Sequence, residues 1–243
     1  MTRTIGIIPS RYGSTRFPGK SLTDIAGKSM VRRVYEQASK ALDEVWVATD
    51  DKRIYDHVME FGRAIMTSSD HPSGTDRCRE AISKIEGDWD YVINIQGDEP
   101  FIDPGEIGRL ASALEEANGD IQIATLVVPI KDKDKIKDPN VVKVVRNLKG
   151  FAMYFSRSPI PFDRNDEPDY LQHIGIYAYR ADILESISEL RPSQLEKCES
   201  LEQLRWLENG FEIKALVGDH PGMGIDTPED LKYVLENKLW QTS

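Results

Sequence analysis

A short segment near the N-terminus, Ser10–Lys20 (SRYGSTRFPGK), concentrates residue types that bind phosphate. It holds three cations, two glycines and several hydroxyls. Glycines let a backbone turn and approach a ligand closely, while main-chain N–H groups, arginine forks and lysine charges bind phosphate oxygens. The β-rich run Ile5–Pro9 directly precedes it, and ligands of α/β sheets bind outside the carboxyl ends of the strands. A solvated basic turn is the alternative, but the position after a strand favours a phosphate-binding loop.

The loop is not a Walker motif. The pattern G-x-x-x-x-G-K-[ST] needs four residues between its glycines, whereas five separate Gly13 from Gly19. No helix is expected to begin at Lys20, because the residues that follow it read as irregular. The later run Gly27–Ser29 has no glycine at the required upstream position. A P-loop NTPase is therefore disfavoured.

Two aspartates stand at junctions where a metal ligand would be placed. Asp98 follows a β-rich run in the turn of INIQGDEP, and Asp226 directly precedes a helix start at Thr227. Mg²⁺ takes hard oxygen ligands, usually one or two carboxylates with phosphate oxygens and waters. Asp98 can equally be a turn residue, and Asp226 can help to cap the helix. The two can share one metal only if the C-terminal segment folds back onto the first loop.

The framework for these groups is predicted to be an α/β fold, with a mostly parallel, Rossmann-like sheet flanked by helices. Short β-rich runs alternate with amphipathic helices in the first part of the chain, which is the signature of a layered sheet. We expect strands at Ile5–Pro9, Val45–Thr49, Ala64–Thr67 and Tyr91–Gln96, and helices at Met30–Leu42, at Asp51–Phe61, after a Ser73 cap and after an Asp103 cap.

The middle of the chain is richer in strands. We expect a single domain over 1–243 that contains a smaller mixed or antiparallel section at about 122–180. The polar run Asp163–Asp169 reads as a mobile loop. The strands of this section are expected at Gln122–Ile130, Val141–Arg146, Phe151–Arg157 and Gln172–Tyr179, followed by a helix at Leu201–Glu208, a strand at Phe211–Val217 and a last helix capped by Thr227.

Composition limits the classes of partner. The net charge of −10 disfavours nucleic acid or an anionic membrane as the main partner. No run approaches the roughly 18 apolar residues of a membrane span, and the N-terminus lacks the features of a signal peptide, so a cytoplasmic protein is expected. Cys78 and Cys198 have no metal-ligand spacing, and Cys78 falls on a helical apolar stripe that predicts an inert core thiol.

Eight blocks of the sequence closely resemble the 3-deoxy-manno-octulosonate cytidylyltransferases, also called CMP-KDO synthetases. The match runs from about Ile5 to Leu235, with every block in the expected order. Two departures are Ser10, where alanine is common, and Phe162, where tryptophan is frequent. The blocks are PSRYGSTRFPGKSL, HPSGTDR, INIQGDEP, VKVV, MYFSRSPIP, HIGIYAYR, LEQLR and GIDTPEDL.

This resemblance implies a Mg²⁺-dependent transfer of CMP from CTP to the anomeric hydroxyl of KDO, with release of pyrophosphate, for lipopolysaccharide synthesis. It also implies a nucleotide-diphospho-sugar transferase-like fold and a homodimer formed through the smaller strand-rich section. A sister group that uses an 8-amino analogue of KDO shares most of the blocks, so the sugar itself stays open.

The resemblance also assigns roles, residue by residue. Arg16, Lys20, Asp98 and Asp226 would be catalytic, with Asp98 and Asp226 as the Mg²⁺ ligands. The CTP-binding residues would be Arg11, Ser14, Arg16, Lys20, Ser73, Gly74, Arg77 and Gln96, and the sugar-binding residues Arg157, His173, Tyr177, Glu202 and Gln203. Structural alternatives exist for three of these, because Arg157 can organise a dimer, His173 can be a satisfied interior histidine and Tyr177 can be core.

Other readings of the chain remain open at this point. A nucleotidyltransferase that activates sialic acid or a sugar phosphate would have a similar fold and metal site with a different acceptor pocket. A nucleotide sensor would bind CTP without Mg²⁺-dependent turnover, although intact Arg16, Lys20, Asp98 and Asp226 argue against it. No dedicated general base is evident, and a metal-activated hydroxyl would serve in its place.

Overall fold

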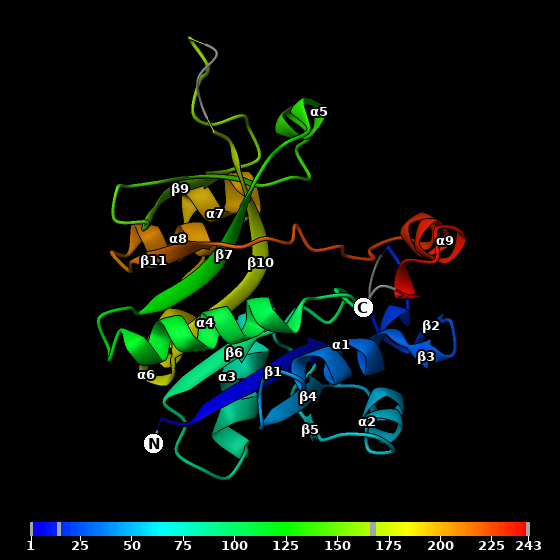
Figure 1. Cartoon of the computed structure of the whole chain (residues 1–243). Helices are drawn as coiled ribbons and strands as arrows, with labels where there is room; N and C mark the ends of the chain where they lie inside the picture. Colours follow the sequence, from blue (N-terminus) through cyan, green and yellow to red (C-terminus); the bar gives the residue numbers. More distant parts are fainter. Residues whose placement is uncertain (1, 14–15, 166–168, 242–243) are drawn as a thin grey trace. The chain divides into compact units, whose positions relative to one another are not determined.

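The computed structural model describes residues 2–13, 16–165 and 169–241. The chain forms two compact units (Figure 1). The first unit joins Met1–Ala111 to the C-terminal segment Gly222–Ser243, and the second is Ser112–Pro221.

Four strands of the first unit pair with one another in parallel. β1 (Thr4–Ser10) lies between β6 (Tyr91–Asn94) and β4 (Val45–Thr49), and β5 (Ala64–Met66) pairs with the outer side of β4. Strands of parallel sheets are covered on both faces, which explains their nearly continuous apolar runs. The core strand β1 is accordingly buried along almost its whole length.

Helices cover both faces of this sheet. α1 (Met30–Ala38) and α3 (Gly74–Lys84) lie on opposite faces (Figure 1). Two close approaches support this placement. A Cβ on Gly6 of β1 would meet Leu42, which follows α1, whereas a Cβ on Gly74, at the start of α3, would meet Pro9. Gly6 and Pro9 are three residues apart on one strand, so they face opposite sides of the sheet. The other helices are α2 (Lys52–Val58), α4 (Pro104–Glu116), within which the unit boundary falls, and α9 (Pro228–Glu236).

Several local expectations are confirmed. The Ser73 side chain accepts a hydrogen bond from the Asp76 N–H and caps α3. Thr227 caps α9 in a capping box with Asp230. The thiol of Cys78 is fully buried and that of Cys198 is exposed.

Several bounds differ from expectation, most by one to three residues, as in α2, which ends at Val58 and not at Phe61. α1 ends at Ala38 and not at Leu42, because the amides of Lys40 and Ala41 bond to carbonyls only three residues back, in tight turns. A 3₁₀ turn, η1 (Lys20–Leu22), begins where no helix was expected. Gly19 precedes it with φ 73°, a left-handed conformation that glycine adopts without strain.

The C-terminal segment folds back onto the first unit. The Ile225 N–H donates to the Asp98 carbonyl oxygen over 2.8 Å. Ile225 and Val234 are buried in one apolar cluster with Ile25 and Met30. A short hairpin, β2 (Asp24–Ile25) and β3 (Lys28–Ser29), precedes α1, and a 3₁₀ turn, η2 (Leu239–Gln241), follows α9. The condition for bringing Asp226 to the first loop is therefore met.

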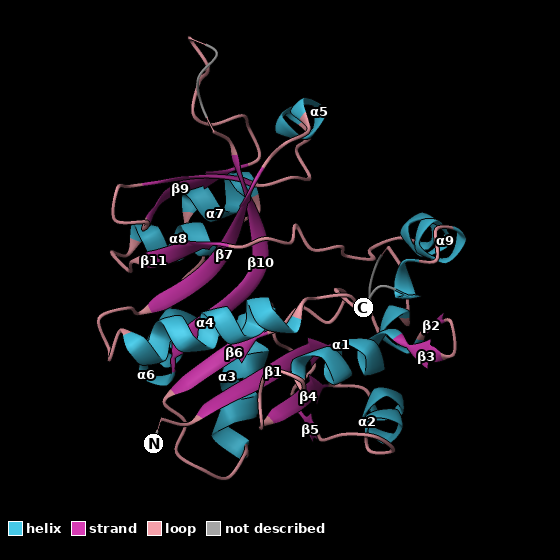
Figure 2. Cartoon of the chain, in the orientation of Figure 1, coloured by secondary structure: helices cyan, strands magenta, loops and turns pink. Residues whose placement is uncertain are grey.

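The strands of the second unit pair both in parallel and antiparallel (Figure 2). β7 (Ile123–Pro129) pairs in parallel with β11 (Ile213–Val217) and antiparallel with β10 (Leu171–Arg180). β8 (Lys143–Arg146) adds to β10, and β9 (Ala152–Ser156) adds to β8, both antiparallel. The register of β10 shifts between Ile174 and Tyr177, where a bulge interrupts the pairing with β7.

The strand-rich section expected at about 122–180 lies inside this second unit, which is longer. It extends to Pro221 because β11 pairs with β7. Three of its helices were not expected: α5 (Lys133–Lys137), α6 (Ala181–Ser188) and α7 (Gln194–Glu199), whereas α8 (Gln203–Glu208) was. Residues 166–168 of the expected mobile loop lie outside the described residues.

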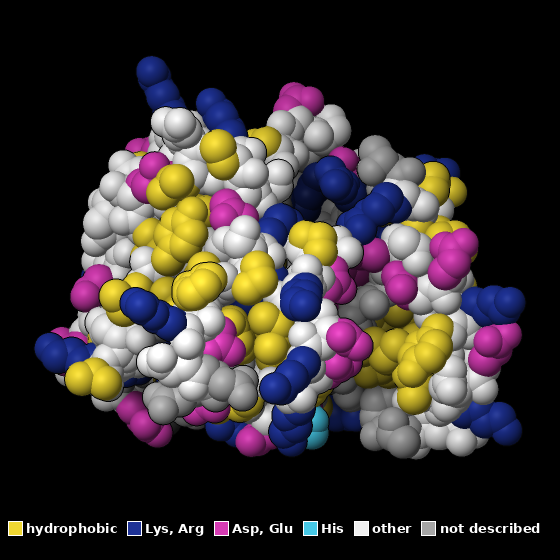
Figure 3. Space-filling view, turned by 90° about the horizontal axis from the view of Figure 1, so that it is seen from above, with side chains coloured by type: hydrophobic (Ala, Val, Ile, Leu, Met, Phe, Trp, Pro, Cys, Tyr) yellow, Lys and Arg dark blue, Asp and Glu magenta, His cyan; other side chains and the backbone are white. Residues whose placement is uncertain are grey.

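On the face drawn in Figure 3, acidic and basic side chains of the described residues are interspersed with apolar ones. Among the described helices, none combines the length and the apolar character that crossing a membrane requires.

Candidate active site

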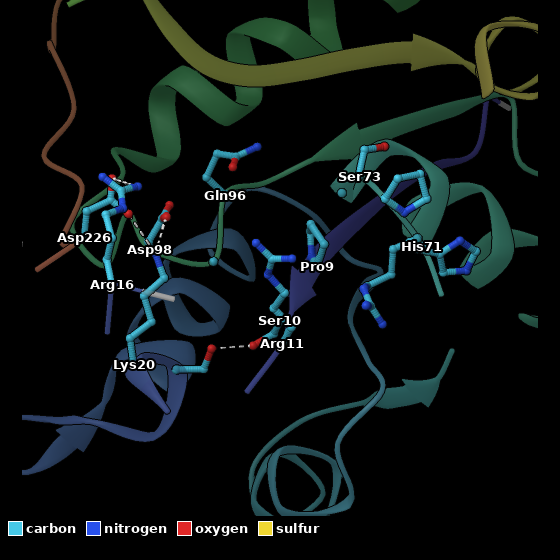
Figure 4. Close-up of a pocket in the computed structure, with 15 residues that line it drawn as sticks. Pro9, Ser10, Arg11, Arg16, Lys20, His71, Ser73, Gln96, Asp98 and Asp226 are labelled. Carbon is cyan, nitrogen blue, oxygen red and sulfur yellow. Dashed lines mark hydrogen bonds and ion pairs between the residues drawn. The ribbon is translucent and has the colours of Figure 1, made fainter. Parts of the chain in front are cut away.

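A cavity of about 280 Å³ opens in the first unit at the carboxyl end of β1 (Figure 4). Seven of the eight predicted nucleotide-binding residues line it, namely Arg11, Arg16, Lys20, Ser73, Gly74, Arg77 and Gln96, as do Asp98 and Asp226. The eighth, Ser14, lies outside the described residues. The cavity thus gathers residues from four separate stretches of the chain.

Two cations and two carboxylates meet on one side of this cavity (Figure 4). Lys20 Nζ donates to Asp98 Oδ2 over 2.6 Å and to Asp226 Oδ1 over 2.9 Å. Arg16 Nη2 lies 3.0 Å from Asp226 Oδ2. All four predicted catalytic residues therefore form one connected cluster.

The charges of this cluster stabilise one another. Burial disfavours the charge on Lys20, but Asp98 and Asp226 outweigh it and raise the lysine pKa. Burial likewise disfavours the charge on Asp226, yet Lys20 and Arg16 outweigh it and lower the carboxyl pKa. The lysine is thus charged at neutral pH while Asp226 is ionised, which is the state that phosphate or metal binding requires.

The two carboxylates suit a magnesium ion as a partial ligand set. One cation, Lys20 Nζ, already contacts an oxygen of both Asp98 and Asp226, so these oxygens can face a single positive centre. Among the described residues no third histidine, cysteine or acidic side chain joins a possible metal group. Mg²⁺ is often held by one or two carboxylates with phosphate oxygens and waters, so a bound phosphate would have to complete the set.

The start of α3 forms another wall of the cavity. Helix N-termini attract anions through free N–H groups and the helix dipole. The hydroxyl of Ser73 is engaged in the cap, accepting from the Asp76 N–H and donating to Asp76 Oδ2. The buried Arg77 donates to Thr67 Oγ1 over 2.5 Å and lies 3.3 Å from Asp50 Oδ2. These partners fix the Arg77 guanidinium at the cavity wall.

His71 also lines the cavity, although nothing in the sequence around it predicts a role (Figure 4). Its Nε2 contacts Glu80 Oε2. Burial raises the pKa of Glu80, but Lys84, the Ser68 N–H and His71 outweigh it and lower it to about 2. His71 is the first residue of the HPSGTDR block, but no spacing argument distinguishes it from a loop histidine.

Glu99, next to Asp98, is a second feature that the sequence analysis missed. Burial, with a smaller effect of Asp98, raises the pKa of Glu99 to about 7. Its Oε2 is buried and, within the described part of the chain, has no hydrogen-bond partner. A carboxyl group at the edge of the cluster therefore holds its proton far more tightly than an ordinary glutamate.

Four of the five predicted sugar-binding residues lie in the second unit around β10 and the start of α8. The rings of His173 and Tyr177 are 5.3 Å apart, and Tyr177 also contacts Trp206 at 5.1 Å. Burial, followed by the charge of Glu202, raises the pKa of Tyr177 far above its ordinary value. Gln203 is buried directly after Glu202, at the first residue of α8.

This second group contains buried polar atoms that the described residues leave without a hydrogen-bond partner. They are Tyr177 Oη, Gln203 Nε2 and Trp206 Nε1. Buried polar side chains normally have a hydrogen-bond partner. Three neighbouring side chains without one are therefore consistent with a site where a bound ligand supplies the partners. Trp206 was not among the predicted residues, because an indole on an apolar helix face gives no sign of binding in the sequence.

Arg157, the fifth predicted sugar-binding residue, is held by main-chain carbonyls. Its Nε donates to the Glu199 oxygen over 2.7 Å and its Nη1 to the Pro139 oxygen over 2.8 Å. Its own N–H donates to Glu199 Oε2. The described structure therefore gives Arg157 a local structural role, and its role toward a sugar stays a prediction.

Comparison with known proteins places these sites in context. The family model for cytidylyltransferases matches residues 5–214. The chain is 51% identical to 3-deoxy-manno-octulosonate cytidylyltransferase of Bacteroides thetaiotaomicron, over 96% of either chain. It is 50% identical to the enzyme of the same name from Thermodesulfovibrio yellowstonii, over 94% of this chain and 95% of the relative.

Solved structures agree. A structure of CMP:2-keto-3-deoxy-manno-octonic acid synthetase complexed with CTP matches with a TM-score of 0.93 and 44% identity, covering 99% of this chain and all of the other. The 4-diphosphocytidyl-2C-methyl-D-erythritol synthase of Anaerococcus prevotii matches with a TM-score of 0.65 at 15% identity, over 98% of this chain and 99% of the other, a likeness of fold alone. The α/β architecture is therefore shared with nucleotidyltransferases.

Proposed function

This chain belongs to the 3-deoxy-manno-octulosonate cytidylyltransferase family, and we propose that it transfers CMP from CTP to 3-deoxy-manno-octulosonate (KDO) and releases pyrophosphate. The observation that carries the proposal is the cluster of Arg16, Lys20, Asp98 and Asp226 in one cavity at the end of β1. The product CMP-KDO would serve lipopolysaccharide synthesis in the cytoplasm.

The triphosphate is assigned to the cationic side of the cavity. Arg11, Arg16 and Lys20 supply the positive charge. The base and ribose are assigned to the wall formed by Ser73, Gly74, Arg77 and Gln96, with His71 beside them.

A magnesium ion is assigned to Asp98 and Asp226. When bound, it would neutralise phosphate charge and lower the pKa of the attacking hydroxyl. Lys20 contacts the same two carboxylates, and we expect its ammonium to move from them toward the phosphates when a metal binds there. That movement would bring its charge to the substrate.

The reaction forms one bond and breaks one. The anomeric oxygen of KDO attacks the α-phosphorus of CTP in line, the bond from that phosphorus to the bridging oxygen breaks, and pyrophosphate leaves with that oxygen. The hydroxyl proton passes to solvent. Phosphoryl-type transfer depends mainly on alignment and charge stabilisation, so the chain's own part is to hold the phosphates and, through Arg16 and Lys20, to stabilise charge on the leaving group.

KDO is assigned to the polar cluster of the second unit. The unpartnered Tyr177 hydroxyl, Gln203 amide and Trp206 indole N–H offer hydrogen bonds to a polyhydroxylated acid. His173 and Glu202 complete the set, and Arg157 is retained as the predicted partner of the sugar carboxylate.

A pyrophosphate-release assay with CTP tests the function directly. We expect Mg²⁺-dependent release with KDO and little with sialic acid or a sugar phosphate, and the 8-amino analogue of KDO belongs in the same panel. Preference for another acceptor would change the assigned sugar but keep the reaction class. CTP binding without release for any acceptor would indicate a nucleotide sensor.

We also propose that the enzyme is a homodimer formed through the second unit. Leu148, Met153 and Phe162 of this unit are exposed apolar side chains, which a dimer contact would cover. Light scattering after size exclusion measures the mass. A mass of one chain, 27.5 kDa, across the micromolar range would reject the proposal.

A further inference from the structure

Thr125, in the middle of β7, places its hydroxyl against three polar atoms of β10. Oγ1 lies 2.7 Å from the Ile176 carbonyl oxygen, 3.2 Å from the Ile174 carbonyl oxygen and 3.0 Å from His173 Nε2. The hydroxyl is fully buried. It sits under the bulge of β10, where Ile174 pairs with Leu126 but the next pair joins Tyr177 to Thr125.

The Thr125 hydroxyl has one proton, and the three polar atoms around it determine which of them receives that proton. Both carbonyl oxygens are acceptors only, so one of them must receive the proton, and Ile176 offers the shorter contact. The Thr125 oxygen then faces His173 with a lone pair. The short contact to Nε2 is therefore a hydrogen bond that the histidine donates.

We infer that Thr125 fixes His173 in the tautomer with a proton on Nε2, so that Nδ1 accepts a hydrogen bond from a sugar hydroxyl. This inference rests on the proposed function, which assigns His173 to the sugar site. It makes Thr125 a positioning residue, since it acts on the substrate only through the histidine.

The surroundings of the ring support a neutral histidine. Phe155 lies edge-on to it with ring centroids 5.0 Å apart, and Tyr177 lies on another side at 5.3 Å. Burial lowers the pKa of His173 to about 3. A neutral ring gives the sugar carboxylate no positive charge, so it favours a hydroxyl as the group that His173 recognises.

The other ring nitrogen remains available for that task. Within the described residues Nδ1 has no hydrogen-bond partner, and the main-chain N–H of His173 is already bonded to the Val142 carbonyl. An imidazole whose Nε2 donates can only accept at Nδ1. Thr125 thus determines which of the two nitrogens is the acceptor.

The test combines a spectroscopic and a kinetic measurement on the full-length enzyme. Nitrogen-15 NMR of the imidazole rings distinguishes the two neutral tautomers, and the chain has four histidines, so His173→Gln identifies the signal. We expect the Nε2–H form of His173 in the wild type and in Thr125→Ser, which keeps the hydroxyl. In Thr125→Val, whose side chain has nearly the same shape but no hydroxyl, we expect His173 to lose its preference for this tautomer.

In kinetics, Thr125→Val is expected to raise KM for KDO about 3- to 10-fold, the effect of one hydrogen bond, with KM for CTP unchanged. Thr125→Ser, which keeps the hydroxyl, is expected to have a KM for KDO close to that of the wild type. An Nδ1–H tautomer in the wild type would overturn the inference without any variant. The same holds if Thr125→Val keeps the wild-type tautomer, or loses it with no change in KM for KDO. Failure of the proposed function is separate, because it would appear as no turnover of KDO by the wild type.

Discussion

The ammonium of Lys20 lies 2.6 Å from a carboxylate oxygen of Asp98, which follows it 78 positions later in the chain. The same ammonium contacts Asp226, so it lies between the two carboxylates that we propose as metal ligands. A lysine ammonium and a divalent cation are both attracted to these oxygens. In the proposed mechanism the lysine would therefore compete with the metal until a triphosphate offers it another anion.

Replacing Lys20 by alanine tests this competition. Turnover is expected to fall about 10²- to 10³-fold, the usual cost of removing one group that stabilises developing charge. Without nucleotide, the variant is expected to bind Mn²⁺, used as a spectroscopic probe for Mg²⁺, more tightly than the wild type, because nothing competes for the carboxylates. Lys28→Ala, which removes a comparable ion pair with Glu36 outside the cavity, is the control. Wild-type turnover in Lys20→Ala would refute the phosphate-loop assignment.

Asp98→Asn removes one predicted metal ligand with almost no change of shape. We expect turnover to fall by at least about 10²-fold, because metal-ion catalysis contributes several kcal/mol of charge stabilisation. The unfolding transition should stay cooperative. Asp56→Asn, in the exposed ion pair with Lys52, provides a matched loss of charge. Near-normal turnover of Asp98→Asn, measured by pyrophosphate release, would remove the metal assignment.

Much of the first unit was predictable because its signals are local. Buried strands read as apolar runs, and caps such as Ser73 and Thr227 mark helix starts wherever the chain folds. The proximity of Asp98 and Asp226 could not be predicted from local signals. Only the return of the C-terminal segment, held by the Ile225 N–H on the Asp98 carbonyl, brings them together.

The features that were not predicted from the sequence fall into two groups. Two helices have local signals in the sequence. For α7 the signal is the capping box of Ser193 and Glu196, and for α6 it is the apolar stripe of Ile183, Leu184 and Ile187, which are buried. Other features depend on tertiary surroundings. The raised pKa of Glu99 arises from burial, which a hydrophilic GDEP turn does not announce.

Gly97 is predicted to be indispensable to the placing of Asp98. A Cβ at this position would lie 2.9 Å from the Pro9 carbonyl oxygen, a main-chain atom near the end of β1 that cannot easily move. Gly97→Ala is expected to cost about 1–3 kcal/mol of stability and to lower turnover by displacing the turn. Urea denaturation and the pyrophosphate assay measure the two effects.

The control for Gly97 lies in α4. A Cβ on Gly108 meets no atom within 4 Å, and alanine is the better helix former. Gly108→Ala is therefore expected to stabilise the protein by about 0.5–1 kcal/mol without loss of turnover. Equal behaviour of the two alanine variants would contradict the close approach at Gly97.

The buried carboxyl of Glu99 should make stability depend on pH in a definite direction. Its pKa is raised from 4.5 to about 7, chiefly by burial. Between these values the unfolded chain has lost the proton while the folded protein keeps it, so the folded state binds more protons. Stability then falls as pH rises through this window and is constant, for this group, below about 4.5 and above about 7.

Glu99→Gln removes the titrating group and keeps nearly the same shape. The free energy of unfolding of the variant minus that of the wild type is expected to increase from pH 4.5 to pH 8, by at most about 3.5 kcal/mol, since one pKa unit corresponds to about 1.4 kcal/mol. Urea denaturation of both proteins in the presence of a chelator measures this difference, and groups that both proteins share largely cancel. The glutamine's own burial cost shifts the difference equally at every pH. A difference that stays flat, or that decreases toward pH 8, would show that Glu99 ionises freely beside Asp98.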